Sequence, residues 1–315
     1  MPVFPGEKSA ARRHERGKRF RQAAPLMALS LPAVVSLFIF AYLPMFGLFI
    51  AFKDINYAKG IFGSDWCGLK NFEFFFTSQD AFRVTRNTIL YNLVFIVVGL
   101  ALSIVIAMIL YELSAKLVKV FQTVLFVPYF LSWVVVGFVS YVFLNPAAGV
   151  LNQILTHFGA DTVNWYATKE AWPVILPLFY LWKNVGYNAI IFYTGLMGID
   201  RSLFEAADLD GASKFQQRIH ITLPMIKTLI IVMAVLSVGK IMFSDFGLFY
   251  FISRDTGMIY SVTDVIDTYV YRALRVTGDI GMSAAVTFYQ SVVGFILVFI
   301  TNLVIRKVSP EDALF

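Results

Sequence analysis

The chain has 315 residues, of which 58% are hydrophobic and only 15% are charged, and its mean hydropathy is +0.72. A soluble protein of this length needs far more charge to cover its surface, so the composition excludes a soluble domain and indicates an integral membrane protein. The net charge of +6 suits basic residues on the cytoplasmic side of a membrane better than it suits a nucleic-acid partner. A single cysteine excludes an internal disulfide, and three scattered histidines have no metal-ligand spacing.

The chain begins with a basic, polar stretch that is followed by a long apolar run. Residues 1–24 are expected to form a cytoplasmic tail, because seven Lys or Arg residues fall within the first 21 positions. The uncharged run 22–52 is too long for the core of a cleaved signal peptide and predicts a first spanning helix at 26–52. Pro32 and Pro44 lie inside this helix and should kink it or mark its ends.

Further apolar runs predict five more spanning helices. Pro128 falls inside the third span, and Asn145-Pro146 should end that span as a turn. The expected fold class is an all-α integral membrane protein with six transmembrane helices in a domain at 25–308, followed by a cytoplasmic tail at 309–315. The later spans are expected at 88–111, 120–144, 172–197, 225–243 and 280–305, and external segments at 53–86, 145–171 and 244–279.

An even number of spans places both termini on one side of the membrane. The termini and the loops on their side carry 15 Lys or Arg residues, whereas the opposite side carries 9. Because basic residues accumulate on the cytoplasmic side, both termini and the loop at 198–224 are expected in the cytoplasm.

The loop at 198–224 is a polar stretch between two apolar runs, and its residues predict two short helices. Ser202 and Glu205 have the spacing of a capping box, and Gly211 suits the left-handed residue that follows a helix end. A second helix should begin near Ser213, and Pro224 suits the first turn of the next span. Residue chemistry leaves two interpretations: an interfacial helix with its apolar side toward lipid, or a docking helix whose small residues let a partner approach closely.

The string Glu205-Ala-Ala-x-x-x-Gly211-x9-Ile221-x-Leu223-Pro224 fills every position of the signature loop of ATP-binding-cassette importer permeases, so the chain resembles that family. The resemblance implies a type I importer permease core in the bacterial cytoplasmic (inner) membrane. In that family the loop is the coupling helix, which seats in a groove of a cytosolic ATPase. The residues that the resemblance assigns to the ATPase contact are Glu205, Ala206, Ala207, Asp210, Gly211 and Ala212.

Four other stretches, at 42–54, 64–72, 122–133 and 264–271, look like the polysaccharide branch of the carbohydrate-type permeases, which includes alginate importer subunits. The resemblance implies a homologous second permease subunit, a cytosolic ATPase dimer and an extracytoplasmic sugar-binding protein as partners, in addition to membrane lipid. No G-x-x-x-x-G-K-[ST] phosphate loop occurs in the chain. No cofactor is therefore expected on this chain, and ATP and Mg are expected on the partner ATPase.

Charged residues within spans are functional candidates, because an unpaired charge is costly in hydrocarbon. Lys183 and Tyr187 share one face of the fourth predicted span, with Asn184 and Asn188 beside it. Amides and hydroxyls can bond sugar hydroxyls, and a lysine suits a carboxylated sugar. Alternatively, Lys183 pairs with an acid elsewhere in the complex, and the two asparagines hold helices together.

Three more residues are candidates for the same substrate path, namely Trp133, Tyr193 and Lys240. Aromatic residues make up 17% of the chain, so most of them should face lipid or form interfacial belts. For Lys240 the alternative is a local salt bridge with Asp245, or a side chain that snorkels to the membrane surface.

Together these features predict a transport subunit and not an enzyme, since no H-E-x-x-H or G-x-S-x-G motif appears. Alternating access driven by a separate ATPase is expected to import an oligo- or polysaccharide. An acidic, alginate-like cargo is the first expectation, and a neutral oligosaccharide is the second. An ion-driven secondary transporter is the alternative of another class, but it would need acids within the spans and repeated halves, and neither is evident. A structural membrane scaffold would leave the signature loop unexplained.

Overall fold

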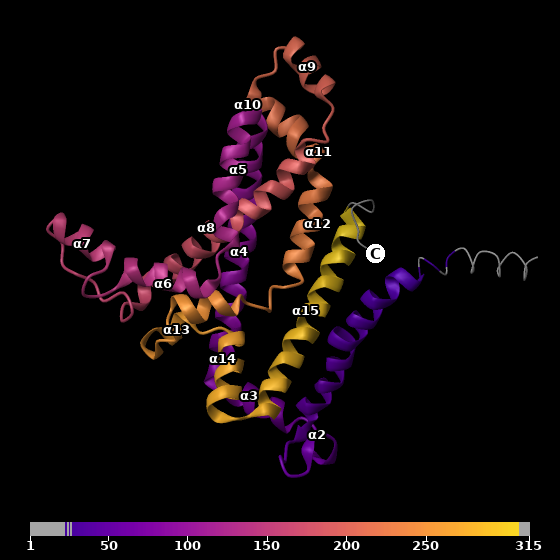
Figure 1. Ribbon diagram of the computed structural model, residues 1–315, viewed down its shortest axis with the longest axis vertical. Helices are drawn as coiled ribbons and strands as arrows, with labels where there is room; N and C mark the ends of the chain where they lie inside the picture. The colour runs from indigo at the N-terminus through magenta and orange to yellow at the C-terminus, as the bar shows by residue number, and fades with distance from the viewer. Residues whose placement is uncertain (1–22, 24, 26, 309–315) are drawn as a thin grey trace, which may run out of the picture.

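The computed structural model describes residues 23, 25 and 27–308, and this part of the chain is mostly helical (Figure 1). Its strands are β1 (Lys53–Asp54) and β2 (Asp65–Trp66), which pair antiparallel. Most of the predicted N-terminal tail, at 1–22 and 24, and the predicted C-terminal tail at 309–315 lie outside the described residues.

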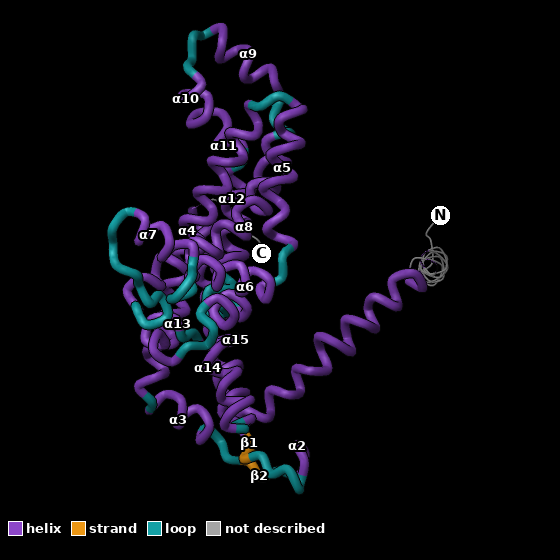
Figure 2. Tube along the Cα trace, turned by 60° about the vertical axis from the view of Figure 1, so that its left-hand side comes forward, coloured by secondary structure: helices purple, strands orange, loops and turns teal. Residues whose placement is uncertain are grey.

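The first predicted span is a helix at Met27–Phe52, whose N-terminal part extends away from the rest of the molecule and whose end at Phe52 packs on Phe288 (Figures 1 and 2). It changes pitch through a π-helical turn, η1 (Phe38–Tyr42), and a 3-10 segment, η2 (Leu43–Phe52), which has Pro44 in its first turn. The end of the span at Phe52 is as predicted, whereas the helix continues through both Pro32 and Pro44. Within the most apolar 18-residue window of this helix no residue is buried, so its side chains are free to face lipid or a partner.

The second span begins earlier than predicted. After the short helices α2 (Gly60–Gly63) and α3 (Lys70–Thr77), helix α4 runs over Gln79–Glu112, so the external loop predicted to reach residue 86 ends at Ser78. The Ser78 hydroxyl caps the helix by accepting a hydrogen bond from the Ala81 amide at 3.3 Å. The charged residues of the first turns misled the prediction, because they are paired by other parts of the fold and do not mark a loop.

The third predicted span, at 120–144, is not a single helix. Helix α5 (Ala115–Phe130) and helix α6 (Trp133–Leu144) are separate and meet at an angle of 97°. Helix α5 passes through Pro128 and ends at Phe130, after which the Leu131 amide donates to the Pro128 carbonyl. The Ser132 hydroxyl starts the new helix by accepting a hydrogen bond from the Val135 amide. We call this bend the α5–α6 elbow, residues 128–133.

The turn predicted at Asn145-Pro146 is confirmed. The Asn145 side chain accepts hydrogen bonds from the Ala147 and Ala148 amides at 2.9 and 3.0 Å. Helix α7 (Val150–His157) and the 3-10 turn η3 (Lys169–Ala171) follow. Helix α8 (Trp172–Leu196) then matches the fourth predicted span and passes through Pro177 without a break.

The polar loop contains α9 (Arg201–Leu209) and α10 (Lys214–Gln217), and the chain returns through η4 (Arg218–Thr222) and α11 (Leu223–Met225). Helix α12 (Lys227–Val238) follows after a bend of 62°. The fifth span was predicted to reach 243, but its helix ends at Val238. The Asn92 amide donates to the carbonyls of Ile241 and Phe243, which replaces the helical hydrogen bonds of this segment.

The last part of the chain is a series of short helices that ends in one long helix. Helix α15 (Ile280–Val308) begins where the sixth span was predicted. The short elements before it are η5 (Leu248–Ile252), η6 (Gly257–Ile259), α13 (Tyr260–Thr263), α14 (Ile266–Arg272) and η7 (Ala273–Thr277).

Among the described residues, three helices are long and apolar enough to cross a membrane, namely Met27–Phe52, α4 and α15. The number is five if each of the two bent pairs counts as one span. Helix α8 has the length of a span but carries Lys183 and two asparagines, which lower its hydropathy. The count of six spans therefore stays a prediction.

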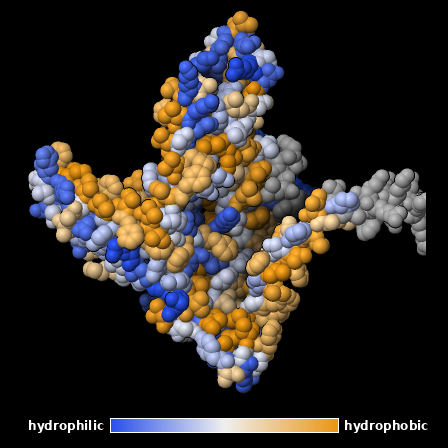
Figure 3. All heavy atoms as spheres, viewed as in Figure 1, coloured by the Kyte–Doolittle hydropathy of each residue, from blue (hydrophilic) through white to orange (hydrophobic). Residues whose placement is uncertain are grey.

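Helices α4, α5 and α8 form the centre of the molecule, where they lie side by side (Figure 1). Phe95 of α4 stacks on Tyr180 of α8 with ring centroids 3.8 Å apart. At Gly186 of α8, a Cβ atom would lie 1.9 Å from the Leu125 carbonyl oxygen of α5, so only glycine permits this approach. Figure 3 shows hydrophobic residues over much of the visible surface and hydrophilic residues gathered over α9 and α10 at one end. This distribution fits a protein embedded in a membrane.

Candidate functional site

Helix α9 lies at the far end of the molecule from α2, beyond the end of α5 (Figures 1 and 2). The predicted capping box at Ser202 and Glu205 is wrong. Asp200 is the N-cap, and its carboxylate accepts a hydrogen bond from the Ser202 amide at 3.0 Å. This backbone hydrogen bond lowers the pKa of Asp200 below the usual aspartate value. A capping box occurs instead at Ser213 and Gln216, so the predicted start of the second helix is confirmed.

Gly211 ends α9 as predicted. Its φ of +77° is left-handed. Its amide donates to the Asp208 carbonyl at 3.2 Å, and the Ala212 amide donates to the Ala207 carbonyl at 2.9 Å. These two hydrogen bonds form a Schellman motif, which satisfies the last carbonyls of the helix and turns the chain back.

Helices α9 and α10 are joined by a cluster of polar side chains around Asp208. The Lys214 ammonium lies 3.0 Å from the Asp208 carboxylate, and the Gln217 amide donates to the same carboxylate. The hydrogen bonds from Lys214 and then Gln217 lower the pKa of Asp208. The two short helices are thus held as one hairpin, residues 200–217, which we call the tip hairpin.

The tip hairpin is attached to the spans at two points. The Phe204 ring packs on Tyr111 of α4, with centroids 5.9 Å apart. The Arg218 guanidinium makes two hydrogen bonds, of 2.7 and 2.6 Å, to the Glu112 carboxylate at the end of α4. Under the hairpin lies a cavity of about 650 Å³, and Tyr193 is one of its lining residues. Both contacts join this loop to the end of α4.

The tip hairpin carries the residues assigned to the ATPase contact, and Glu205 among them lines the cavity under the hairpin. Glu205, Ala206 and Asp210 are exposed, and Ala207 is half-buried. Leu209 is 90% exposed and Phe215 is 66% exposed, although both are large and apolar. Such side chains at a polar end of a membrane protein suit a protein partner.

A second cavity, of about 470 Å³, lies between α4, α8 and the residues that follow α12. We call it the central cavity. Four predicted path residues line it: Asn184, Tyr187, Asn188 and Lys240. Tyr129 of α5 also lines it, and its ring stacks on Tyr187 with centroids 4.4 Å apart and an interplanar angle of 9°.

The structure adds residues to the central cavity that the sequence analysis did not select as path residues. Asn92, Tyr129 and Ser237 line it, and so does Asp245, which had been considered only as a partner of Lys240. Asn92 was open to prediction, because it is a polar amide within an otherwise apolar span. Nothing in the sequence distinguishes Tyr129 from the many aromatic residues that face lipid.

The other predicted path residues lie elsewhere. Tyr193 lines the cavity under the tip hairpin. Trp133 donates its indole N–H to the Asp245 carboxylate at 2.7 Å. Asp245 and Lys240 both line the central cavity but do not form the local salt bridge that was one expectation. Lys183 is only 7% exposed, and its ammonium donates to carbonyl oxygens of the α5–α6 elbow.

On the side opposite the tip hairpin, buried charges join α4 to α13 and α14. Asp264 is 2% exposed, and its carboxylate pairs with Arg83 at 3.1 Å and with Arg272. Arg272 also pairs with Asp255 at 2.7 Å. Each guanidinium therefore compensates the buried carboxylate, as a buried charge requires.

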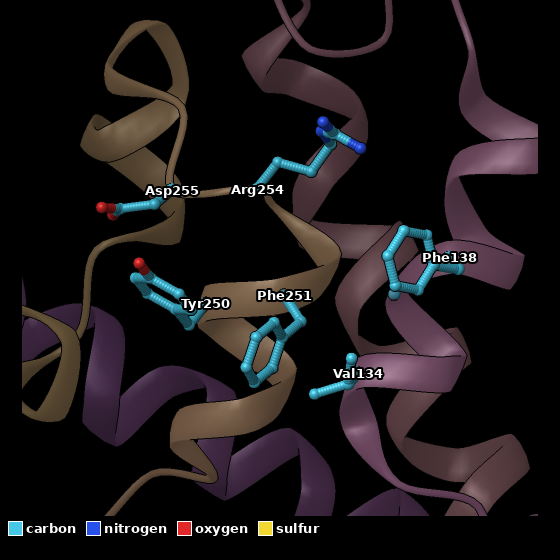
Figure 4. A pocket seen from close by; sticks show the side chains of 7 residues that line it. Val134, Phe138, Tyr250, Phe251, Arg254 and Asp255 are labelled. Atoms are coloured by element: carbon cyan, nitrogen blue, oxygen red, sulfur yellow. The ribbon is translucent and has the colours of Figure 1, made fainter.

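Beside these charges lies a smaller cavity, of about 300 Å³. Figure 4 shows Val134 and Phe138 of α6 opposite Phe251 of η5, with Arg254 and Asp255 at the rim. Both rim residues have positive φ angles, of 56° and 47°. The Arg254 guanidinium stacks over the Tyr141 ring at 4.1 Å, which supports the strained turn.

Known proteins are similar to this chain over nearly its whole length. Residues 99–310 match the family described as binding-protein-dependent transport system inner membrane component. The chain is 34% identical to the polygalacturonan/rhamnogalacturonan transport system permease protein YteP of Bacillus subtilis, over 91% of this chain and 89% of that protein.

Two solved structures are also similar to the chain. One is a bacterial ABC transporter involved in the import of the acidic polysaccharide alginate, with a TM-score of 0.84 at 29% identity over 94% of this chain and 99% of that one. The other is the bacterial alginate ABC transporter in complex with an alginate pentasaccharide-bound periplasmic protein, with a TM-score of 0.83 at 29% identity over 93% and 97% of the two chains.

Proposed function

Since the chain belongs to the family of binding-protein-dependent transport system inner membrane components, and is the membrane-embedded permease of an ATP-binding-cassette sugar importer with the type I fold, we propose that its tip hairpin is the coupling element of that importer. The chain is a transport component and not an enzyme. Energy then reaches the spans from a separate ATPase, and the hairpin is the place where it enters.

The geometry of the tip hairpin supports the coupling role. Helix α9 of the hairpin is capped at both ends, by Asp200 and by the turn at Gly211, and the Asp208 cluster joins it to α10. The hairpin offers the exposed Glu205 carboxylate beside small residues, a combination that lets a partner backbone approach and form a charge-assisted hydrogen bond. Arg218 and Phe204 join the hairpin to α4, which lines the central cavity.

For the cargo we propose an acidic oligosaccharide. Two of the similar proteins have names that specify acidic polysaccharides, polygalacturonan and alginate. The central cavity offers side-chain amides, stacked tyrosine rings and the Lys240 ammonium. Rings and amides serve any sugar, whereas a cation favours a carboxylated one, so a neutral oligosaccharide is the second candidate.

The proposed assembly contains a homologous second permease, a cytosolic ATPase dimer and an extracytoplasmic sugar-binding protein. The similar alginate transporter was solved with its periplasmic protein, which supports the last of these partners. The exposed helix Met27–Phe52 has apolar surface for lipid or for the second permease. The proposed location is the bacterial inner membrane, with both termini and the tip hairpin in the cytoplasm.

The test is charge reversal at Glu205 in the assembled transporter. We expect Glu205→Arg to lower sugar-stimulated ATP hydrolysis at least tenfold and to weaken co-purification of the ATPase. Glu170→Arg, the same change at an exposed position in η3 away from the hairpin, is the matched control and should leave both unchanged. Normal stimulation and normal co-purification in Glu205→Arg would refute the coupling role.

A second measurement separates the importer from an ion-driven transporter. Proteoliposomes that contain ATP on the cytoplasmic side but no ion gradient should accumulate oligosaccharide. Accumulation that needs an ion gradient and ignores ATP would support the secondary transporter instead.

A further inference from the structure

The Lys183 ammonium has no donor left for a ligand. Its Nζ lies 2.6 Å from the Tyr129 carbonyl oxygen, 2.6 Å from that of Leu131 and 3.3 Å from that of Pro128. An ammonium group has three N–H donors, and all three acceptors belong to the α5–α6 elbow. The Tyr129 and Trp133 rings lie 5.4 and 5.3 Å from the same nitrogen. A sugar carboxylate could reach Lys183 only by displacing these groups.

The elbow needs this lysine for a physical reason. A helix end leaves its last carbonyl oxygens without helical partners, and in a membrane no bulk water is present to bind them. The C-terminal end of a helix also carries partial negative charge, which a cation stabilises. Lys183 of α8 supplies both the donors and the charge to the end of α5, which stabilises the 97° bend.

Two further contacts hold the elbow in place. Trp133, the first residue of α6, is hydrogen-bonded to Asp245, and a Cβ atom at Gly247 would lie 2.4 Å from the Trp133 ring. The elbow is thereby tied to α8 on one side and to the segment before η5 on the other. Both α8 and the segment before η5 contribute residues to the central cavity.

Tyr129 connects the elbow to the central cavity. Its carbonyl oxygen accepts from Lys183, while its ring lines the cavity and stacks on Tyr187. The Lys183 hydrogen bond fixes the backbone from which the Tyr129 ring projects. Loss of that bond should displace the ring pair without removing any group that touches the cargo.

Lys240 differs from Lys183 in its exposure, its position and its contacts. It is exposed and it lines the central cavity. Within the described part of the chain, its ammonium makes no ion pair, and the Asp245 carboxylate, which lines the same cavity, accepts a hydrogen bond from the Trp133 indole. Its charge is therefore available to a ligand in the cavity.

We propose that the two lysines have separate roles: Lys183 is a positioning residue that holds the α5–α6 elbow and the Tyr129–Tyr187 ring pair, whereas Lys240 is the specificity-determining cation of the central cavity. This inference rests on the proposed function, since it assigns the residue that recognises an acidic sugar. It also reverses the simplest interpretation of the sequence, in which Lys183 faces the cargo.

The first experiment compares Lys240→Met with Lys183→Met in the fully assembled transporter, with acidic and neutral oligosaccharides of equal length. Lys240→Met should raise the KM for the acidic sugar about tenfold relative to the neutral one, because one charge-assisted hydrogen bond is lost. Lys183→Met should raise KM for both sugars by the same factor. A change of the acidic-to-neutral ratio in Lys183→Met, with no change in Lys240→Met, would overturn the assignment.

The second experiment asks whether Lys183 acts through Tyr129. If it does, Lys183→Met should raise KM less than twofold in a Tyr129→Leu background, although it raises KM several-fold in the wild type. Independent effects that multiply in the double variant would contradict the positioning role. Lys183→Gln keeps donors for the elbow carbonyls but removes the charge. If Lys183→Met fails to assemble, Lys183→Gln replaces it in the comparison of KM between the wild-type and Tyr129→Leu backgrounds.

Different measurements refute the proposed transport function and the positioning role of Lys183. A wild-type assembly that moves no oligosaccharide refutes the proposed function. In that event hydrogen–deuterium exchange still tests the elbow: Lys183→Met or Lys183→Gln should speed exchange at residues 129–133, while Lys240→Met should not. Unchanged exchange in both Lys183 variants would refute the positioning role.

Discussion

The Arg218 guanidinium and the Glu112 carboxylate form two parallel hydrogen bonds, of 2.7 and 2.6 Å, between the chain leaving the tip hairpin and the end of α4. Two parallel bonds fix the relative orientation of the two groups as well as their distance. Because α4 runs from this point to the central cavity and on to the buried charges around Asp264, one rigid helix connects all three regions.

Glu112→Gln should uncouple the transporter without unfolding it. Both side chains are more than a third exposed, so the ion pair contributes only about 0–1 kcal/mol to stability. The ion pair matters more for the orientation of the hairpin than for the stability of the protein. We therefore expect sugar-stimulated ATP hydrolysis to fall several-fold while basal hydrolysis and Tm stay unchanged. Asp65→Asn, which removes the exposed ion pair with Lys59, is the control. Equal stimulation in both variants would contradict the prediction.

Gly211→Ala should destabilise the tip hairpin locally. No atom lies within 4 Å of the Cβ that alanine would add, so the expected cost of about 1–2 kcal/mol comes from the left-handed φ alone. Faster hydrogen–deuterium exchange at 206–214 would report it. Gly211→Asn, which tolerates this conformation better, should lie between alanine and wild type, and the opposite order would exclude the conformational explanation.

Asp264→Asn should have a large effect on the stability of the whole protein. Asp264 is buried between Arg83 and Arg272, and removal of one partner from such a cluster typically costs about 3–5 kcal/mol. Thermal unfolding of the purified protein measures it. Asp54→Asn, at an exposed ion pair with Lys70, should change Tm little. A Tm for Asp264→Asn within experimental error of the control would contradict the prediction.

Gly186→Ala should separate α5 from α8. The added Cβ would meet the Leu125 carbonyl oxygen at 1.9 Å, and backbone cannot yield as a flexible side chain can. A destabilisation of about 1–3 kcal/mol is expected, together with faster exchange at the elbow. Gly47→Ala is the control, because its added methyl group meets no atom within 4 Å. Similar Tm values for the two variants would mean that the close contact is not needed.

The tip hairpin should resist mild acid. Hydrogen bonds from Lys214 and Gln217 lower the pKa of Asp208, so the carboxylate stabilises the hairpin above the usual aspartate pKa and loses this effect as pH falls through its lowered pKa. The hairpin should thus be intact at pH 5 and loosen only below about pH 4. Hydrogen exchange at 206–217 against pH measures this, and Asp208→Asn should show no such transition. Loosening already near pH 5 in the wild type would contradict the assigned pKa direction.

The tip hairpin was predictable because its signals are local. Gly211 ends the first helix and Ser213 begins the second one, as expected from their positions in the sequence. The start of the first helix was misplaced because Asp200 and Ser202 are comparably good N-caps, and a sequence alone does not decide between two such residues so close together.

The central cavity was predictable only in part. The residue pattern of α8 predicts a helix with a polar face, and the predicted path residues Asn184, Tyr187 and Asn188 do line one cavity, while their contact with a substrate stays a prediction. Tyr129 and Asn92 come from other helices, and their meeting with α8 depends on the glycine contact at Gly186 and on the elbow.

By itself, the sequence determined the membrane class, most of the helices and the tip hairpin, because composition, apolar run length and capping act over a few residues. Only the tertiary structure decided that the third predicted span is an elbow and that Lys183 serves it. The carbonyl oxygens of the elbow lie 52 to 55 residues before that lysine in the chain. An ammonium is bound where folding leaves acceptors unpaired, and no pattern in the neighbouring residues of Lys183 records where those acceptors will be.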